Sequence, residues 1–335
     1  MKREGKWELL RAISCISVVL LHVAALYTEE VQVYQHYPNI SFSFCDFIQI
    51  ITRTAVPCFV MLSGAFMLDK QHLNVVEFYK KSLPKLIIPT LLFEIFYMMV
   101  SVFGGNSVAG ALHGALTGNI AGHLWFMFMM MGLYITFPLL YFIKQNIDHK
   151  MFVVFSLVMV LICCIIHFTC KLAWASQCLE FIGYFLMGNL IRRIGKKLSG
   201  SVCNWLLLSV GFLLITFILN EYQFYRGEYD PAFFRNPNFP TVIIASLSFF
   251  IAFSKMELNY IPSAFLKIAK HSVVIYMLHP FVINVICKVA KKLCGGWLPT
   301  PFVYVPFLFI VCLLLTYAVA CVLDYVRNKT LKVLI

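Results

Sequence analysis

The sequence predicts an all-α polytopic membrane protein with about ten transmembrane helices and cytoplasmic N- and C-termini. Of its 335 residues, 61% are hydrophobic and only 13% are charged, and the mean hydropathy is +0.84. A soluble domain of this length is far more polar. The apolar residues form ten runs, and lysine and arginine gather between alternate runs. Because no polar stretch is long enough for a soluble domain, we expect one membrane domain over residues 1–335.

Each apolar run is expected to form one helix, because about 20 residues cross a bilayer core of about 30 Å. The expected spans are 9–28, 46–68, 84–103, 121–143, 151–169, 173–192, 203–220, 239–254, 272–290 and 301–325. The eighth is short. An even number of spans puts both termini on the same side of the membrane.

The distribution of basic residues identifies that side. With the N-terminus inside, cytoplasmic segments hold 20 of the 27 lysines and arginines, outer segments hold 6, and Arg53 lies within a span. This bias favours cytoplasmic termini by the positive-inside rule. The net charge of +12 therefore indicates topology and attraction to anionic lipid, and it does not indicate a nucleic-acid partner.

Cysteine and histidine do not form the patterns of a disulfide framework or a metal site. The twelve cysteines include no C-x-x-C pair, and most lie inside apolar runs, where cysteine acts as a small apolar residue. The histidines show no ligand spacing. We therefore expect no metal.

The first span carries the sharpest functional signal. Arg11 and His22 are the only residues between Leu9 and Tyr27 whose side chains carry a charge or gain one near neutral pH. Eleven residues of α-helix make three turns plus roughly 20°, so both side chains lie on one face, roughly 16 Å apart along the axis. Such residues in a membrane helix are functional candidates. The structural alternatives are a hydrogen-bonded packing histidine and an arginine that follows the positive-inside rule.

Four further titratable residues stand out well inside expected spans. Arg53, Glu94, Glu180 and His279 are costly in hydrocarbon unless they pair or face a wet cavity. From depth alone, Arg53 and Glu180 are the simplest ion pair. His279 precedes Pro280, which indicates a kink that exposes backbone carbonyls. Structural ion pairs and packing remain the alternatives for this group.

The outer loop Glu221–Phe239 is aromatic. It holds seven aromatic residues among nineteen. Such rings form either an interfacial belt or a surface that stacks on a sugar.

The motifs, taken in order, resemble those of the integral-membrane acyltransferase family three. The arginine–histidine spacing of Arg11 and His22 comes first. The other matching segments are RTAVPCFVMLSGAFML (Arg53–Leu68), GHLWFMFMMMGLYITFPLL (Gly122–Leu140), FIGYFLMGNLI (Phe181–Ile191) and HSVVIYMLHPFV (His271–Val282). In size the chain is similar to the short members that lack an extracytoplasmic domain, such as the enterobacterial common antigen O-acetyltransferase. Serine racemase membrane domains of vancomycin resistance and exopolysaccharide O-succinyltransferases look similar too, so the acceptor stays open.

The resemblance implies transfer of an acyl group, usually acetyl, from cytoplasmic acyl-CoA to a hydroxyl of a surface or lipid-linked glycan, in the inner membrane of a bacterium. By analogy His22 is the catalytic histidine, as a base or as an acyl carrier. Arg11 would hold the CoA phosphates, and Arg53 would stabilise the oxyanion or hold the acceptor. Glu94, Glu180 and His279 would support them.

Two other functions remain compatible with buried charges in a helix bundle. One is a proton-coupled secondary transporter, although no inverted repeat is visible in the sequence. The other is a non-enzymatic component of polysaccharide export. The acyl chain, the leaflet of transfer and the oligomeric state stay open at this point.

Overall fold

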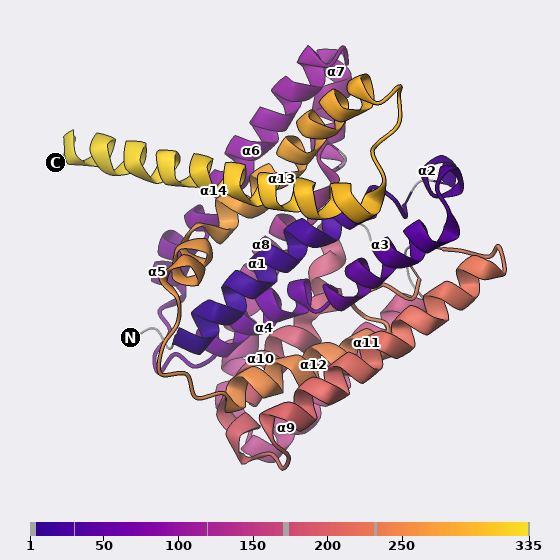
Figure 1. Ribbon diagram of the computed structural model, residues 1–335. Helices are drawn as coiled ribbons and strands as arrows, with labels where there is room; N and C mark the ends of the chain where they lie inside the picture. The colour runs from indigo at the N-terminus through magenta and orange to yellow at the C-terminus, as the bar shows by residue number, and fades with distance from the viewer. Residues whose placement is uncertain (1–4, 30, 119, 170–173, 231–232, 334–335) are drawn as a thin grey trace. The chain divides into compact units, whose positions relative to one another are not determined.

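Helices form the regular structure of the chain. The structure is a computed structural model that describes residues 5–29, 31–118, 120–169, 174–230 and 233–333. No strand occurs among these described residues (Figure 1). The all-α class predicted from the sequence is thereby confirmed.

Each expected span contains helix among its described residues. The α-helices are α1 Gly5–Ala25, α2 Val31–His36, α3 Asn39–Ile51, α4 Ala55–Met67, α5 Val75–Ser82, α6 Pro84–Phe103, α7 Val108–Leu116, α8 Trp125–Asn146, α9 His149–Thr169, α10 Ile182–Ile194, α11 Val202–Tyr225, α12 Pro240–Lys255, α13 Ser263–Leu293 and α14 Pro301–Val333. Three short 3₁₀ helices are η1 Gly122–Leu124, η2 Trp174–Phe181 and η3 Gly195–Lys197.

Within the described ranges, eight helical segments are long and apolar enough to cross a membrane, with α3 and α4 taken together and α5 and α6 taken together. The sixth and eighth expected spans correspond to α10, with 13 residues, and α12, with 16 residues. The protein is thus a polytopic membrane protein. The count of ten spans and the cytoplasmic placement of the termini stay predictions.

Large apolar side chains are exposed along α6, α9, α11 and α14. Leu92, Leu161, Leu207 and Leu314 are each about 60% exposed. In water such faces would aggregate, whereas lipid chains cover them at no cost. The outward faces of these helices therefore suit a bilayer.

The expected span 46–68 is not one continuous helix. It divides into α3 and α4 at the turn Thr52–Thr54. Pro57 explains the break, because its ring has no N–H and would clash with the carbonyl of Arg53 if the helix continued. Arg53 therefore lies in a turn between two helices.

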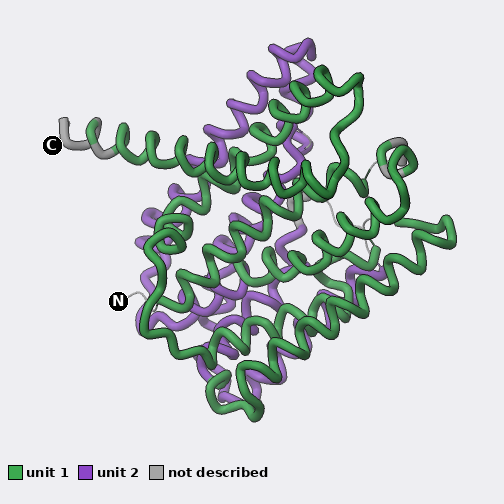
Figure 2. Tube along the Cα trace, in the orientation of Figure 1, with its two compact units in different colours: residues 1–59, 194–335 green, residues 60–193 purple. Residues whose placement is uncertain are grey.

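The described chain divides into two compact units (Figure 2). Unit 1 comprises residues 1–59 and 194–335, and unit 2 comprises residues 60–193. The boundary falls inside α4, so this helix contributes to both units. The expectation of a single membrane domain over residues 1–335 stays a prediction.

In unit 1, α1 is the central helix. It packs against α3, α12, α13 and α14, and Leu10, Val19 and Val23 on its buried faces are fully covered. Helix α11 runs along α12 (Figure 1), where Ser209 Oγ donates to the Ala245 carbonyl at 2.8 Å. The helix that carries Arg11 and His22 is therefore enclosed on several sides.

In unit 2, α4 and α10 touch through glycine. A Cβ added to Gly64 would lie 1.7 Å from the Phe185 carbonyl oxygen, and one added to Gly188 would lie 2.0 Å from that of Met61. Small residues of this kind let two membrane helices approach closely. Lys144 Nζ donates to the Leu68 carbonyl at 2.6 Å, which satisfies a carbonyl at the end of α4.

Candidate active site

His22 is held in one tautomer by its own helix. It lies in the last turn of α1, and its Nδ1 is 2.9 Å from the carbonyl oxygen of Val18, one turn earlier. Because a carbonyl only accepts, Nδ1 carries the proton. In the neutral ring Nε2 then keeps its lone pair. The arrangement leaves a proton acceptor on the outer side of the imidazole.

His279 approaches His22 from α13. The two ring centroids are 4.8 Å apart in an edge-to-face arrangement, and His279 is fully buried. Pro280 has no N–H, so the Tyr276 carbonyl loses its usual donor four residues later. His279 Nδ1 donates to this carbonyl at 2.6 Å. The proline thus sets the orientation and the tautomer of the preceding histidine, while α13 continues through it.

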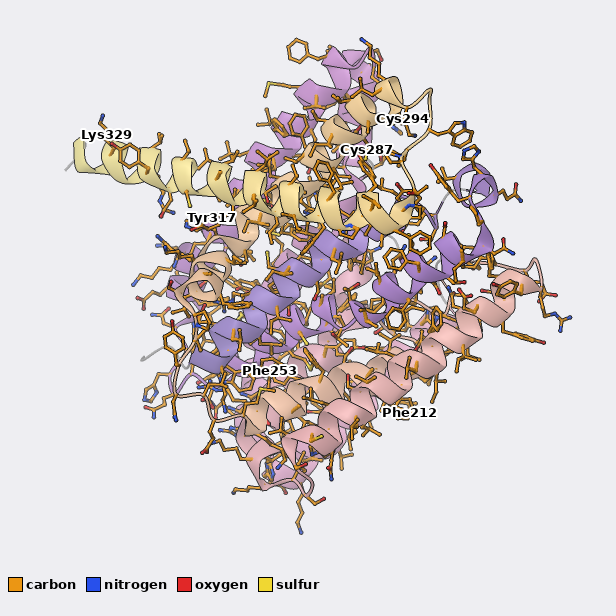
Figure 3. All side chains as sticks on the ribbon, in the orientation of Figure 1. Phe212, Phe253, Cys287, Cys294, Tyr317 and Lys329 are labelled. Atoms are coloured by element: carbon orange, nitrogen blue, oxygen red, sulfur yellow. The ribbon has the colours of Figure 1, made fainter. Side chains whose placement is uncertain are left out.

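A cavity of about 380 Å³ opens beside His22. It lies between the end of α1, the middle of α13 and the segments that follow both helices. Its polar lining comprises His22, Glu29, Tyr37, Asn284 and Lys291, and Trp297 and Leu298 close another side. Trp297 also stacks on His36, with centroids 3.6 Å apart. The end of α13 with Cys287 borders this region (Figure 3).

Arg53 reaches the same region from the turn between α3 and α4. Its Nη2 donates to Gln49 Oε1 at 2.5 Å, and its Nε is buried without a hydrogen bond to any described residue. The charges of Arg53 and Glu29 lie close enough to act on the His22 ring. Of the predicted site residues, His22 and His279 are therefore in direct contact, and Arg53 is near enough for its charge to act on His22.

Arg235, which the sequence did not single out, extends this cluster. Its side chain is 1% exposed although it belongs to the loop after α11. Its Nη1 donates to Gln49 Oε1 at 2.5 Å and to Thr28 Oγ1 at 3.3 Å, and it lies 3.7 Å from Asp46 Oδ1. Its Nη2 donates to the hydroxyl of Tyr229. Burial lowers the pKa of the Arg235 guanidinium, and the Asp46 carboxylate opposes that effect.

Gln49 joins the two arginines. Its amide oxygen accepts from both guanidinium groups, and its Nε2 donates to Thr28 Oγ1. Asp46 in turn accepts from Asn220 Nδ2 at 2.7 Å. Asp46 and Gln49, three residues apart, lie on one face of α3, and Arg53 follows Gln49 by four residues in the turn after the helix. This spacing is the sequence signal that could have revealed the polar face of α3.

Arg11 lies apart from this cluster. Its Nη1 is 3.1 Å from Glu8 Oε1, and eleven residues of helix separate it from His22 by roughly 16 Å along the axis. Arg11 therefore does not contact the imidazole. Its proposed role at the CoA phosphates stays a prediction.

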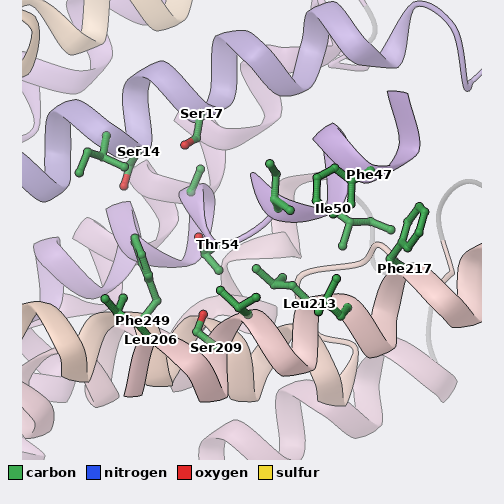
Figure 4. A pocket seen from close by; sticks show the side chains of 15 residues that line it. Ser14, Ser17, Phe47, Ile50, Thr54, Leu206, Ser209, Leu213, Phe217 and Phe249 are labelled. Carbon is green, nitrogen blue, oxygen red and sulfur yellow. The ribbon is translucent and has the colours of Figure 1, made fainter. Parts of the chain in front are cut away.

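A second cavity in unit 1 has a different chemistry. It measures about 210 Å³ and lies between α1, the α3–α4 turn, α11 and α12. Aliphatic and aromatic side chains dominate its lining, together with the hydroxyls of Ser14, Ser17, Thr54 and Ser209 (Figure 4). No titratable side chain lines it. The cavity beside His22 combines an imidazole with further polar groups, and it is the candidate active site.

Comparison with known proteins identifies the family. A family model described as an acyltransferase domain, of the acyltransferase-3 type, matches residues 5–321, which is nearly the whole chain. The chain belongs to the acyltransferase-3 family. No curated protein and no solved structure matches it. The protein is thus a membrane acyltransferase, and its resemblance to the enterobacterial common antigen enzymes stays a prediction.

The two glutamates predicted to support catalysis in this acyltransferase belong to unit 2. Glu94 is buried in α6, and its carboxylate forms no hydrogen bond with the described residues. Glu180 is half-buried in η2. Their supporting roles and the Arg53–Glu180 ion pair stay predictions. Among the described residues no three metal-ligating side chains come together.

Proposed function

We propose that this acyltransferase moves an acyl group, acetyl in the first instance, from cytoplasmic acyl-CoA to a hydroxyl group of a cell-surface or lipid-linked glycan. One observation carries the proposal. His22 Nδ1 is committed to the Val18 carbonyl, and the same imidazole lines a cavity with room for a ligand. A neutral histidine with a free Nε2 is the group that acyl transfer to a hydroxyl requires.

A single nitrogen, His22 Nε2, accepts and then returns the proton that moves in this reaction. His22 Nε2 takes the proton of the acceptor hydroxyl while that oxygen attacks the carbonyl carbon of the thioester. The tetrahedral intermediate then collapses, the C–S bond breaks, and the CoA thiolate takes the proton back from the imidazolium. His22 ends the cycle neutral, and the products are an O-acyl ester and free CoA.

The neighbouring charges support this chemistry. Arg53 places a guanidinium near His22 with a buried Nε that no described residue engages, and such a donor stabilises a developing oxyanion. Arg11, near the other end of α1, is assigned to the phosphates of CoA, which a guanidinium binds well. His279 orients His22 by its edge-to-face contact.

The cavity lining suits a sugar acceptor. Trp297 and Tyr37 offer aromatic surface, and Glu29, Asn284 and Lys291 offer groups that bind hydroxyls. Binding sites combine such apolar walls with a few polar groups that fix orientation. We therefore place the acceptor in this cavity, with its reacting hydroxyl toward His22.

The test uses purified protein in lipid nanodiscs with radiolabelled acetyl-CoA and glycan extracted from the host. Wild-type protein should label the glycan, and His22→Ala should lower the rate by about 100-fold or more, the usual contribution of a general base. His271→Ala is the matched control, because His271 on α13 contacts Tyr317 and lies outside the cavity.

Full retained activity in His22→Ala would refute the proposed role of the histidine. Glycan that stays unlabelled with every acyl-CoA tested would refute the acyl transfer to glycan. Acid quench followed by mass spectrometry separates direct transfer from an acyl-histidine intermediate, because only the second adds an acyl group to the His22 peptide.

A further inference from the structure

A basic pocket lies in unit 2, far along the chain from His22. It has a volume of about 400 Å³ and forms where residues 68–74 lead into α5 and α6. Lys70, Lys81 and Lys85 line it, together with His72 and Glu77. The distribution of lysine and arginine predicts that this end of the helices faces the cytoplasm.

The positive charge of the pocket is only partly neutralised. Lys81 Nζ lies 2.5 Å from Glu77 Oε1, so this carboxylate already has a partner. Among the described residues, neither Lys70 nor Lys85 forms an ion pair. Two ammonium groups therefore face the pocket with one shared carboxylate nearby, which leaves an excess of positive charge.

Lys70 is held in place by aromatic rings. Its Nζ lies 4.7 Å from the ring centroid of Phe78 and 5.8 Å from that of Phe137, distances at which a ring face attracts a cation. Burial lowers the pKa of Lys70, Lys85 lowers it further, and Glu77 opposes both. A bound anion would relieve the repulsion between the two lysines.

The start of α5 borders the same pocket. Asn74, which also lines it, caps the helix and accepts from Glu77 N at 3.0 Å. The remaining N–H groups of the first turn have no partner within the helix, and the N-terminal end of the helix carries a partial positive charge. Together with the lysines, such a helix end favours phosphate.

We propose that this pocket binds a phosphate group at the membrane surface. Two molecules can supply it, the head group of an anionic phospholipid or the phosphates of CoA. Binding of a lipid head group does not depend on the proposed reaction, whereas binding of CoA rests on it. With either ligand, a phosphate group lies between Lys70 and Lys85.

The affinity of the purified protein in detergent for each probe distinguishes a phospholipid ligand from CoA. The probes are dioctanoyl phosphatidylglycerol, dioctanoyl phosphatidylcholine as its zwitterionic control, CoA, and 3′-dephospho-CoA. The pocket variant is Lys70→Gln with Lys85→Gln. The matched control is Lys80→Gln with Lys150→Gln, because both residues are exposed in unit 2 and neither lines the pocket. Thermal unfolding without ligand verifies that both variants fold.

We expect the pocket variant to bind one anionic probe about tenfold more weakly, since each lysine contributes about a factor of a few. Loss confined to phosphatidylglycerol assigns the pocket to lipid, and loss confined to CoA assigns it to the donor. Equal losses of affinity in the pocket and control variants would overturn the proposal, because the anionic probe would then be attracted by the general positive charge of the surface and not by this pocket. Unchanged binding of both anionic probes by the pocket variant would also overturn it.

Discussion

Replacing Arg235 with methionine removes the guanidinium that links the loop after α11 to α3. Methionine keeps much of the length and fills the apolar part of the site, so the change isolates the charge and its hydrogen bonds. The variant leaves the Asp46 carboxylate, which is fully buried, with Asn220 as its remaining hydrogen-bond partner. Gln49 and Thr28 lose a donor as well.

The expected cost follows from this burial. Removing one partner of a buried ion pair costs about 3–5 kcal/mol of folding free energy, because the other charge stays buried without compensation. Arg226→Met is the matched control from the same loop. The side chain of Arg226 is 55% exposed beside Glu228, and such exposed pairs contribute at most about 1 kcal/mol.

The free energy of unfolding is measured by titrating detergent-solubilised protein with dodecyl sulfate. Asp46→Asn alone and combined with Arg235→Met completes a double-mutant cycle, and we expect a coupling of about 1–3 kcal/mol. Equal decreases in the free energy of unfolding for Arg235→Met and Arg226→Met would refute the assignment of Arg235 as a buried structural cation. Strictly additive effects of Asp46→Asn and Arg235→Met would refute it as well.

Three further predictions concern helix geometry. His279→Asn should slow acyl transfer by about 100-fold, the effect expected of a misplaced neighbouring group, with binding of acyl-CoA unchanged in a filter assay. Pro280→Ala supplies an N–H that competes for the Tyr276 carbonyl, so transfer should slow while stability holds or rises by up to about 3 kcal/mol; faster transfer would contradict the tautomer argument. Gly64→Ala should lower the free energy of unfolding by about 3 kcal/mol or more, since its methyl group would meet backbone on α10. Gly211→Ala has open space around it and should raise the free energy of unfolding by about 0.5–1 kcal/mol. Similar melting temperatures for the two alanine variants would contradict the close packing.

The helical fold could be predicted from the sequence because a bilayer imposes simple requirements. A run of about 20 apolar residues has few alternatives to a helix in lipid, so each expected span contains helix among its described residues. Hydropathy could not detect the break at Thr52–Thr54, because the residues around it are as apolar as a helix interior. Pro57 was the available signal, and it acts on the carbonyl of a residue four positions earlier.

The candidate site was predictable only in part. Charge inside a span pointed to His22, Arg53 and His279, since each is costly in hydrocarbon. Arg235 was hidden by its position in a polar outer loop, where an arginine is ordinarily solvated. Only the folded chain returns that loop to α3, and Asp46 gives the guanidinium a buried partner.

The two backbone carbonyls that fix His22 and His279 have a consequence for how this enzyme can be studied. In many hydrolases an acidic side chain orients the histidine, and replacing that side chain reveals its role. Here main-chain oxygens of Val18 and Tyr276 accept the Nδ1 protons, and no side-chain substitution deletes them. Substituting Val18 or Tyr276 therefore leaves the accepting oxygen in place, and a neighbouring change such as Pro280→Ala acts on it only indirectly. Amide-to-ester exchange in a semisynthetic chain, which weakens a single carbonyl as an acceptor, is the chemical change that reaches it.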